Sequence, residues 1–159
     1  MAPTLYDWIG GISVLEALTQ AFYARVKQDD LIGPVFAKMD DEHPKHVAAF
    51  IGEVFGGPKS YSEQYGGHPE MIRHHLNRHL TEEQRRRWLA LLLDTYEDMD
   101  APHDPEFASA LISYLEWGSR LAVINSQAGV NVPDDTPMPK WGWGEVHGPY
   151  IPKPAKTPA

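Results

Sequence analysis

The sequence predicts an all-α domain followed by a proline-rich C-terminal extension. Apolar side chains recur at helical spacing through residues 1–127, and glycine or proline interrupts them at short intervals. No segment alternates polar and apolar residues as a half-buried strand would. From residue 128 onward the periodicity is lost, and this part holds half of the chain's 14 prolines. We therefore expect a helical domain over 1–127 and a tail over 128–159 that is extended or disordered, with Trp141 and Trp143 able to dock back onto the domain.

Length and charge exclude several classes of protein. The 159 residues fit one domain with a core large enough to enclose a cofactor. The net charge of -8 disfavours binding to nucleic acids or anionic membranes, because both need a basic face. The absence of cysteine excludes disulfides and thiolate metal sites. No secretory signal or apolar run of bilayer length is visible, so we expect a cytoplasmic protein.

The first long helix is expected after Gly10-Gly11, where Ser13 and Glu16 have the spacing of a capping box. Tyr23 lies beside its apolar stripe. Gly33-Pro34 ends this region, and Phe36 follows in a short turn or helix. The stripe consists of Val14, Leu15, Leu18, Phe22 and Val26.

A second helix is expected from about Asp41, with Pro44 in its first turn and Gly56-Gly57-Pro58 as its stop. The segment 58–67 has the composition of a loop. The apolar face of this helix comprises Val47, Phe50, Ile51, Val54 and Phe55.

Three further helices complete the domain. A short one runs from Pro69 through His75, Thr81 and Gln84 form a capping box that opens a long one, and Asp104-Pro105 opens the last. The apolar positions of the two long helices are Trp88, Leu91, Leu92 and Tyr96, then Phe107, Leu111, Tyr114, Leu115, Gly118 and Leu121.

The eight histidines are concentrated, and four of them fall within residues 68–79. Imidazole is the commonest metal ligand and the usual axial ligand of haem. His75 is the best candidate because Met71, Ile72 and Leu76 give it an apolar wall. Zinc binding by His75 and His79, four residues apart, is an alternative that needs at least one further ligand.

Several stretches together resemble the truncated haemoglobins of group II. The resemblance covers residues 4 to about 126 and rests on the order and spacing of the motifs. These are Leu5-Tyr6 to Gly10-Gly11, Ala21 to Val26, Phe50 to Gly56-Gly57-Pro58, Tyr61-Ser62-Glu63-Gln64 to Gly67-His68-Pro69, His75, Trp88 and Tyr114-Leu115-Glu116.

The resemblance implies a truncated globin fold, a two-over-two helical sandwich around haem b (iron protoporphyrin IX). His75 matches the axial ligand of the iron. Tyr23 and Trp88 match the donors to a bound ligand, and Phe36 matches the aromatic residue at the haem edge. His43, His46 and Val47 fall at positions that face the ligand or a propionate.

Further cofactor contacts follow from position. Phe50, Phe55 and Leu76 supply apolar surface, while Tyr61 and His46 are the first candidates for the propionates, with Arg73 and Lys45 after them. His43 departs from the usual small residue, so it can donate to the ligand, gate the pocket or coordinate the iron.

The implied ligands are oxygen, nitric oxide and carbon monoxide, and donors around the oxygen predict tight binding and slow release. Nitric oxide dioxygenation or peroxidase-like turnover would need a partner reductase, because no flavin or nicotinamide motif is present. The alternative is a sensor or store without turnover. The sequence is compatible with a monomer or a homodimer.

Overall fold

A computed structural model describes residues 2–133 and 135–151 of the chain. Within these residues every regular element is helical and no β-strand occurs, which confirms the all-α prediction. None of these helices has the length and apolar character required to cross a bilayer. The elements are α1 (Leu5–Ile9), α2 (Ile12–Gln28), the 3-10 helix η1 (Gly33–Phe36), α3 (His43–Val54), α4 (Ser60–Tyr65), α5 (Gly67–Arg73), α6 (Glu82–Asp98), α7 (Pro105–Asn125) and the 3-10 helix η2 (Gly144–Val146).

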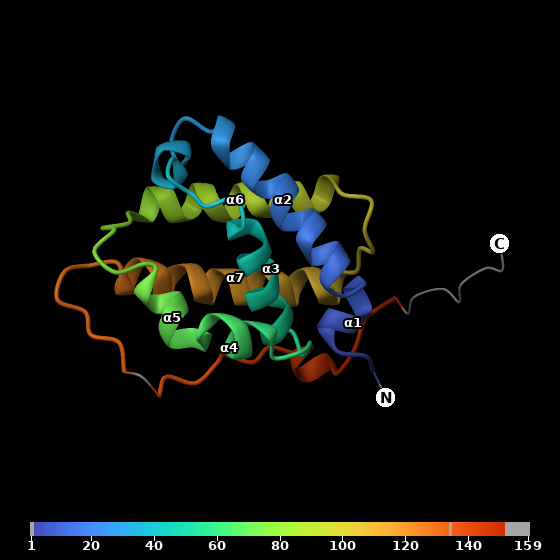
Figure 1. Ribbon diagram of the computed structural model, residues 1–159. Coiled ribbons are helices and arrows are strands. Elements are labelled where there is room, and N and C mark those ends of the chain that lie inside the picture. Colours follow the sequence, from blue (N-terminus) through green and yellow to red (C-terminus); the bar gives the residue numbers. More distant parts are fainter. Residues whose placement is uncertain (1, 134, 152–159) are drawn as a thin grey trace.

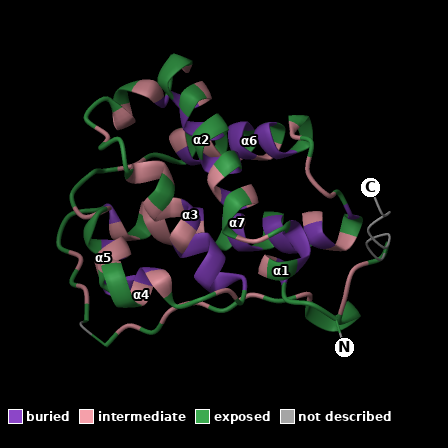
Figure 2. Cartoon of the chain, turned by 45° about the vertical axis from the view of Figure 1, so that its right-hand side comes forward, coloured by how far each residue is buried: buried purple, intermediate pink, exposed green. Residues whose placement is uncertain are grey.

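Two pairs of helices form the body of the molecule. The pair α2 and α3 crosses the pair α6 and α7, and the short helices α4 and α5 lie at one side (Figure 1). The helices turn their buried faces toward one another, so the core lies between the two pairs (Figure 2). The buried Arg85 of α6 donates to Glu116 (3.1 Å) and Ser119 (3.2 Å) of α7, which fixes the second pair. This is the expected two-over-two arrangement.

Two helix starts follow the local sequence as predicted. The Thr81 hydroxyl accepts from the Gln84 N–H at 3.1 Å, and the Gln84 side chain accepts from the Thr81 N–H at 2.9 Å, which completes the capping box of α6. The Asp104 carboxylate accepts from the N–H groups of Glu106 and Phe107 and so caps α7. Each signal needs only residues within one turn, so sequence suffices to find it.

The start of α2 differs from the prediction. Ser13 and Glu16 form no capping box, because α2 already begins at Ile12 with Gly11 as its N-cap. Gly10, at φ 119°, ends α1 in the left-handed region, so the next helix follows at once. The start of α3 also moves, from Asp41 to His43.

The predicted loop over 58–67 was wrong for most of its length, because α4 occupies Ser60–Tyr65. Glu53 of α3 explains this short helix: its carboxylate accepts from the Ser62 N–H at 2.8 Å and from the Ser62 hydroxyl. Helix α5 begins at Gly67, two residues before the predicted Pro69, and ends at Arg73, so His75 lies in the turn after it.

The described part of the tail runs along the domain. The Trp141 N–H donates to the Val54 carbonyl at 2.9 Å, and the Trp143 indole donates to the Pro3 carbonyl at 2.7 Å. The Trp143 ring also packs edge-on against Trp8. Both tryptophans therefore dock. Residue 134 and residues 152–159, which the prediction of an extended or disordered tail also covers, lie outside the described part.

Candidate functional site

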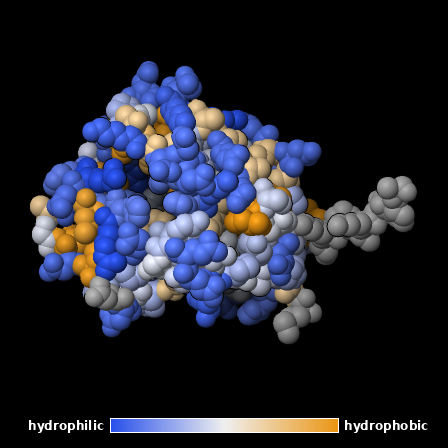
Figure 3. All heavy atoms as spheres, viewed as in Figure 1, coloured by the Kyte–Doolittle hydropathy of each residue, from blue (hydrophilic) through white to orange (hydrophobic). Residues whose placement is uncertain are grey.

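A cavity of about 560 Å³ lies between the helix pairs and is lined by residues from η1, α2, α3, α4, α5, α6 and α7. Figure 3 shows the molecular surface hollowed between hydrophilic side chains. Most of the predicted cofactor contacts meet here: Tyr23, Phe36, His43, His46, Val47, Phe50, Tyr61, His75 and Trp88. The size falls in the range of cofactor pockets, and the mixture of apolar rings with a few polar groups is typical of them.

His75 is oriented by its own turn. The chain tightens after α5, where the His75 N–H donates to the Ile72 carbonyl at 2.9 Å. The ring Nδ1 lies 2.8 Å from the Met71 carbonyl, and since a carbonyl only accepts, Nδ1 carries the proton. Burial lowers the pKa of His75 to about 4, and the cations of Arg78 and His74 add to this against the effect of the Met71 bond. At neutral pH the ring is therefore neutral, with the Nε2 lone pair available to a metal.

Tyr23, His43 and Trp88 form a polar group in the wall. The Tyr23 hydroxyl lies 3.2 Å from His43 Nε2. Burial raises the pKa of Tyr23, and the neighbouring Trp88 indole opposes the rise without cancelling it, so the phenol keeps its proton. Burial also lowers the pKa of His43 to about 4, helped by the charges of His46 and His74. Three neutral groups therefore meet in the cavity wall.

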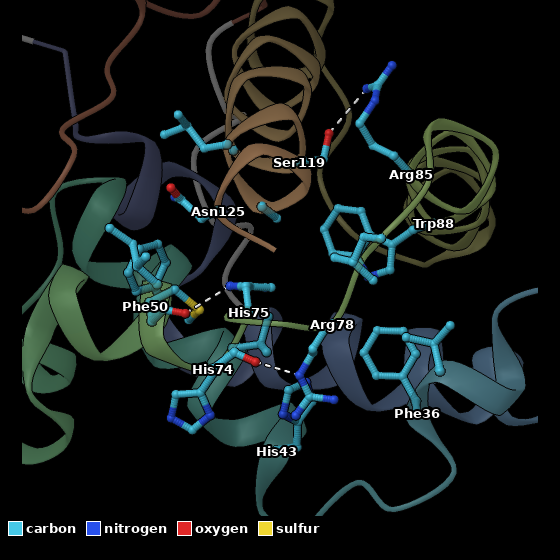
Figure 4. Close-up of a pocket in the computed structure, with 18 of the residues that line it drawn as sticks. Phe36, His43, Phe50, His74, His75, Arg78, Arg85, Trp88, Ser119 and Asn125 are labelled. Atoms are coloured by element: carbon cyan, nitrogen blue, oxygen red, sulfur yellow. Dashed lines mark hydrogen bonds between the residues drawn. The ribbon is translucent and has the colours of Figure 1, made fainter. Parts of the chain in front are cut away.

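Aromatic packing holds these groups in place. The Phe36 ring stands edge-on to Tyr23 with centroids 5.5 Å apart, and the Trp88 ring stands edge-on to Phe22 at 5.4 Å. His43, His75, Trp88 and Phe36 come from different elements and surround the same space in Figure 4.

The polar residues expected at the propionates divide into two sets. Tyr61 and His46 line the cavity, and burial raises the pKa of Tyr61 to about 12. Lys45 and Arg73 do not line it and instead form ion pairs with Glu42 (3.7 Å) and Glu70 (3.3 Å). Other groups that line it, Lys38, His74 and Arg78, were not predicted; Arg78 Nε donates to the His74 carbonyl.

Two predicted contacts lie away from the cavity. Phe55 is fully buried, with its ring edge-on to Phe107 and Tyr114 at 6.1 and 5.6 Å, so it belongs to the core. Leu76 is half-buried and does not line the cavity, because the turn after α5 directs its neighbour His75 there instead.

One wall of the cavity was missed by sequence reasoning. Helix α7 contributes a stripe of lining residues, and α5 contributes His68. The sequence shows this stripe as the apolar face of a helix. Such a face can pack against another helix or border a cavity, and only the small residues in it point to a cavity. Its members include Tyr114, Gly118, Leu121, Ala122 and Asn125.

The structure does not support the zinc alternative. Helix α5 stops before His75, so the spacing of four no longer places His75 and His79 on one helix face. His79 is exposed at φ 51°, and its N–H donates to the Ser126 carbonyl. Among the residues the structure describes, no group of three histidine or carboxylate side chains is positioned to hold a metal ion.

Comparison with known proteins decides the family. The model of the family described as "Bacterial-like globin" matches residues 4–118. The chain belongs to this family. The globin is 29% identical over 123 residues to the group 2 truncated hemoglobin YjbI of Bacillus subtilis, a match that covers 77% of this chain and 90% of that protein.

Two further comparisons support the truncated fold. The truncated oxygen-avid haemoglobin of Bacillus subtilis matches the globin with a TM-score of 0.67 and 28% identity, over 76% of this chain and 99% of that structure. The group 1 truncated hemoglobin GlbN of a Nostoc species is 42% identical over only 67 residues, which is 42% of this chain and 53% of that protein. The chain thus spans about half the length of that relative, whereas the group 2 relative is matched almost throughout.

Proposed function

We propose that this globin holds haem b through His75 and binds oxygen tightly, with nitric oxide and carbon monoxide as further ligands. The observation that carries the proposal is the placement of His75, whose Nδ1 is bonded to the Met71 carbonyl while its ring lines the cavity. Haem, when bound, supplies an iron that takes up diatomic ligands and changes oxidation state.

The donor set fits haem. The His75 imidazole faces a cavity bordered by Phe50, Val47 and the α7 stripe, which suits a flat apolar macrocycle. Tyr61, His46 and Arg78 are the polar groups at its border that would meet the propionates. A bare metal ion would require several donors at one point, and the described residues offer no such group.

The polar wall supports tight binding of oxygen. The Tyr23 hydroxyl and the Trp88 indole both line the cavity, and the Tyr23 proton can turn from His43 toward a ligand. A hydrogen bond to an acceptor that carries negative charge stabilises it by about 1.5–3 kcal/mol. The relative named oxygen-avid has the same fold.

We further propose redox turnover of the bound oxygen with nitric oxide, or of peroxide. Slow oxygen release favours reaction over transport. Neither reaction is complete without an electron donor, and the sequence holds no flavin or nicotinamide motif, so the proposal includes a partner reductase.

The first experiment is a visible absorption spectrum of the oxidised, reduced and carbon monoxide forms, recorded beside His75→Ala and the control His79→Ala. We expect a haem spectrum that collapses or changes ligation in His75→Ala alone. A native chain that takes up no haem would refute the proposal. Mixing the oxygenated form with nitric oxide then separates turnover, which gives rapid oxidation, from a sensor or store, which does not.

A further inference from the structure

Three aromatic rings lead from the cavity wall to the surface of the molecule. Tyr114 and Trp117 of α7 both line the cavity, with ring centroids 6.4 Å apart. Trp141 of the tail packs against both, at 5.6 Å from each. Tyr114 is buried, whereas 38% of Trp117 is exposed. Trp141 is half-buried, so the cluster borders the cavity through Tyr114 and Trp117 and reaches solvent through Trp117 and Trp141.

Hydrogen bonds of the tail backbone hold the Trp141 ring in place. The Trp141 N–H donates to the Val54 carbonyl at 2.9 Å. Four residues earlier, the Pro137 carbonyl accepts from His68 Nδ1 at 3.1 Å, and the His68 ring lies 6.5 Å from Trp117. The family match ends at residue 118, so Trp141 comes from a segment outside it. This chain thus adds a held aromatic ring beside the cavity wall.

Indole and phenol are the side chains that lose an electron most readily, and closely spaced rings pass electrons in short steps. Tyr114 is buried, which disfavours its deprotonation and therefore its oxidation. An indole can lose an electron without first releasing a proton, so the two tryptophans are the better carriers.

We propose that Trp117 and Trp141 form an electron relay through which electron-rich phenols at the surface supply reducing equivalents to the cavity. The relay rests on the proposed haem function, because haem held by His75 would supply the redox chemistry that reduces peroxide. It deepens that function by naming the substrate class, phenols too large to enter the cavity, and the site at which they react.

The reaction balances without another reagent. One hydrogen peroxide molecule takes up two electrons and two protons, its O–O bond breaks, and two water molecules form. Two phenols each lose one electron and one proton and become phenoxyl radicals. Each tryptophan gives up an electron toward the cavity and regains one from the phenol, so it returns to its starting state.

The test uses the full-length, haem-loaded chain and the variants Trp117→Phe, Trp117→Tyr and Trp141→Phe. Trp143→Phe is the matched control, since Trp143 lies in the same tail but packs against Trp8 and Phe107 and does not line the cavity. Oxidation of a bulky dimethoxyphenol by peroxide is measured per bound haem. We expect it to slow several-fold in Trp117→Phe and Trp141→Phe, to recover in Trp117→Tyr, and to be unchanged in Trp143→Phe.

A second measurement does not depend on turnover of a substrate. After treatment with peroxide alone, peptide mass spectrometry should find added oxygen on Trp117 and Trp141 and not on Trp143. Unmodified Trp117 and Trp141, or equal phenol oxidation in Trp117→Phe and the native chain, would overturn the relay while leaving haem binding intact. A native chain without haem would overturn the proposed function, and the relay with it.

Discussion

The Tyr23 hydroxyl lies between two other polar groups, and this position determines what its proton can do. His43 Nε2 lies 3.2 Å away, and the Trp88 indole lines the same wall, where it opposes the rise that burial causes in the Tyr23 pKa. Tyr23→Phe removes the one hydroxyl that can move between His43 and a ligand. Since such a bond contributes about 1.5–3 kcal/mol, we expect oxygen dissociation to accelerate roughly 10- to 100-fold.

Stopped-flow displacement of oxygen by carbon monoxide measures this rate. Tyr65→Phe is the matched control, because Tyr65 packs against His46 and Tyr61 but does not line the cavity. Equal dissociation rates in Tyr23→Phe and the native protein would show that Tyr23 does not donate to the ligand.

His43 makes the fold sensitive to acid. Burial lowers its pKa from 6.5 to about 4, so between these values the unfolded chain binds a proton that the folded chain does not. Stability is therefore complete above about pH 6.5 and falls as the pH drops toward 4. We expect His43→Gln to reduce this loss by about 1–3 kcal/mol.

Urea unfolding at a series of pH values tests the linkage. The exposed His79→Gln serves as the control, because no comparable burial acts on that ring. A pH profile for His43→Gln that parallels the native profile between pH 4 and 6.5 would contradict the assignment to His43.

Among the helices, α7 depends on its N-cap more than α6 does. Asp104 accepts from Glu106 and Phe107 and also from two N–H groups of the tail, that of Ile151 at 2.5 Å and that of Tyr150 at 3.1 Å. Burial alone would raise the pKa of Asp104, but these donors outweigh it and lower the pKa. Asp104→Ala should therefore destabilise the fold by about 2–3 kcal/mol, against about 1 kcal/mol for Thr81→Ala, whose cap serves α6 alone. The denaturant midpoints of the two variants measure this difference. A loss of stability in Asp104→Ala no larger than that in Thr81→Ala would show that the hydrogen bonds of Asp104 to the tail do not stabilise the fold.

Whether the stabilising contacts of an element are local or distant in the chain explains which elements could be predicted from sequence. The caps at Thr81 and Asp104 are local, so the sequence contains the whole signal. Helix α4 depends on a contact outside its own segment. Its residues have loop composition, and the Glu53 carboxylate of α3 accepts the hydrogen bonds that hold Ser62. Ser13 has the spacing of an N-cap but does not act as one, because Gly10 and Gly11 place the start of α2 two residues earlier, at Ile12.

The residues of the candidate site also differ in how well the sequence predicts them. His75 and Tyr23 were recognisable by resemblance, since both occupy positions set by nearby motifs. Arg78 was not, because its place at the cavity depends on the turn that follows α5, and periodicity says nothing about a turn. Phe55 was predicted at the cavity together with the other members of the apolar face of its helix, yet it lies where α3 ends and meets Phe107 instead.

For the molecule as a whole, the tail is a structural part of the domain. Its described residues cross from the end of α7 to Asp104 at the start of the same helix, and they bury parts of Trp141 and Trp143 on the way. Trp143 covers Trp8 and Phe107, and Trp141 covers Tyr114. Full burial of one large apolar side chain is worth about 1.5–3 kcal/mol, and both tryptophans keep some exposure, so their joint contribution is about 2–4 kcal/mol.

Removal of residues 128–159 should therefore lower the free energy of unfolding by about 2–4 kcal/mol, because the three core aromatics that the tail covers lose this cover and the bonds to Val54 and Pro3 are lost. Removal of residues 152–159 alone keeps every contact described for the tail and is the control. Denaturant unfolding followed by circular dichroism avoids the change in tryptophan number that would confuse fluorescence. If the long truncation unfolds at the same midpoint as the short one, the tail contacts contribute nothing to stability, and Trp141 would be free to leave the ring of Trp117.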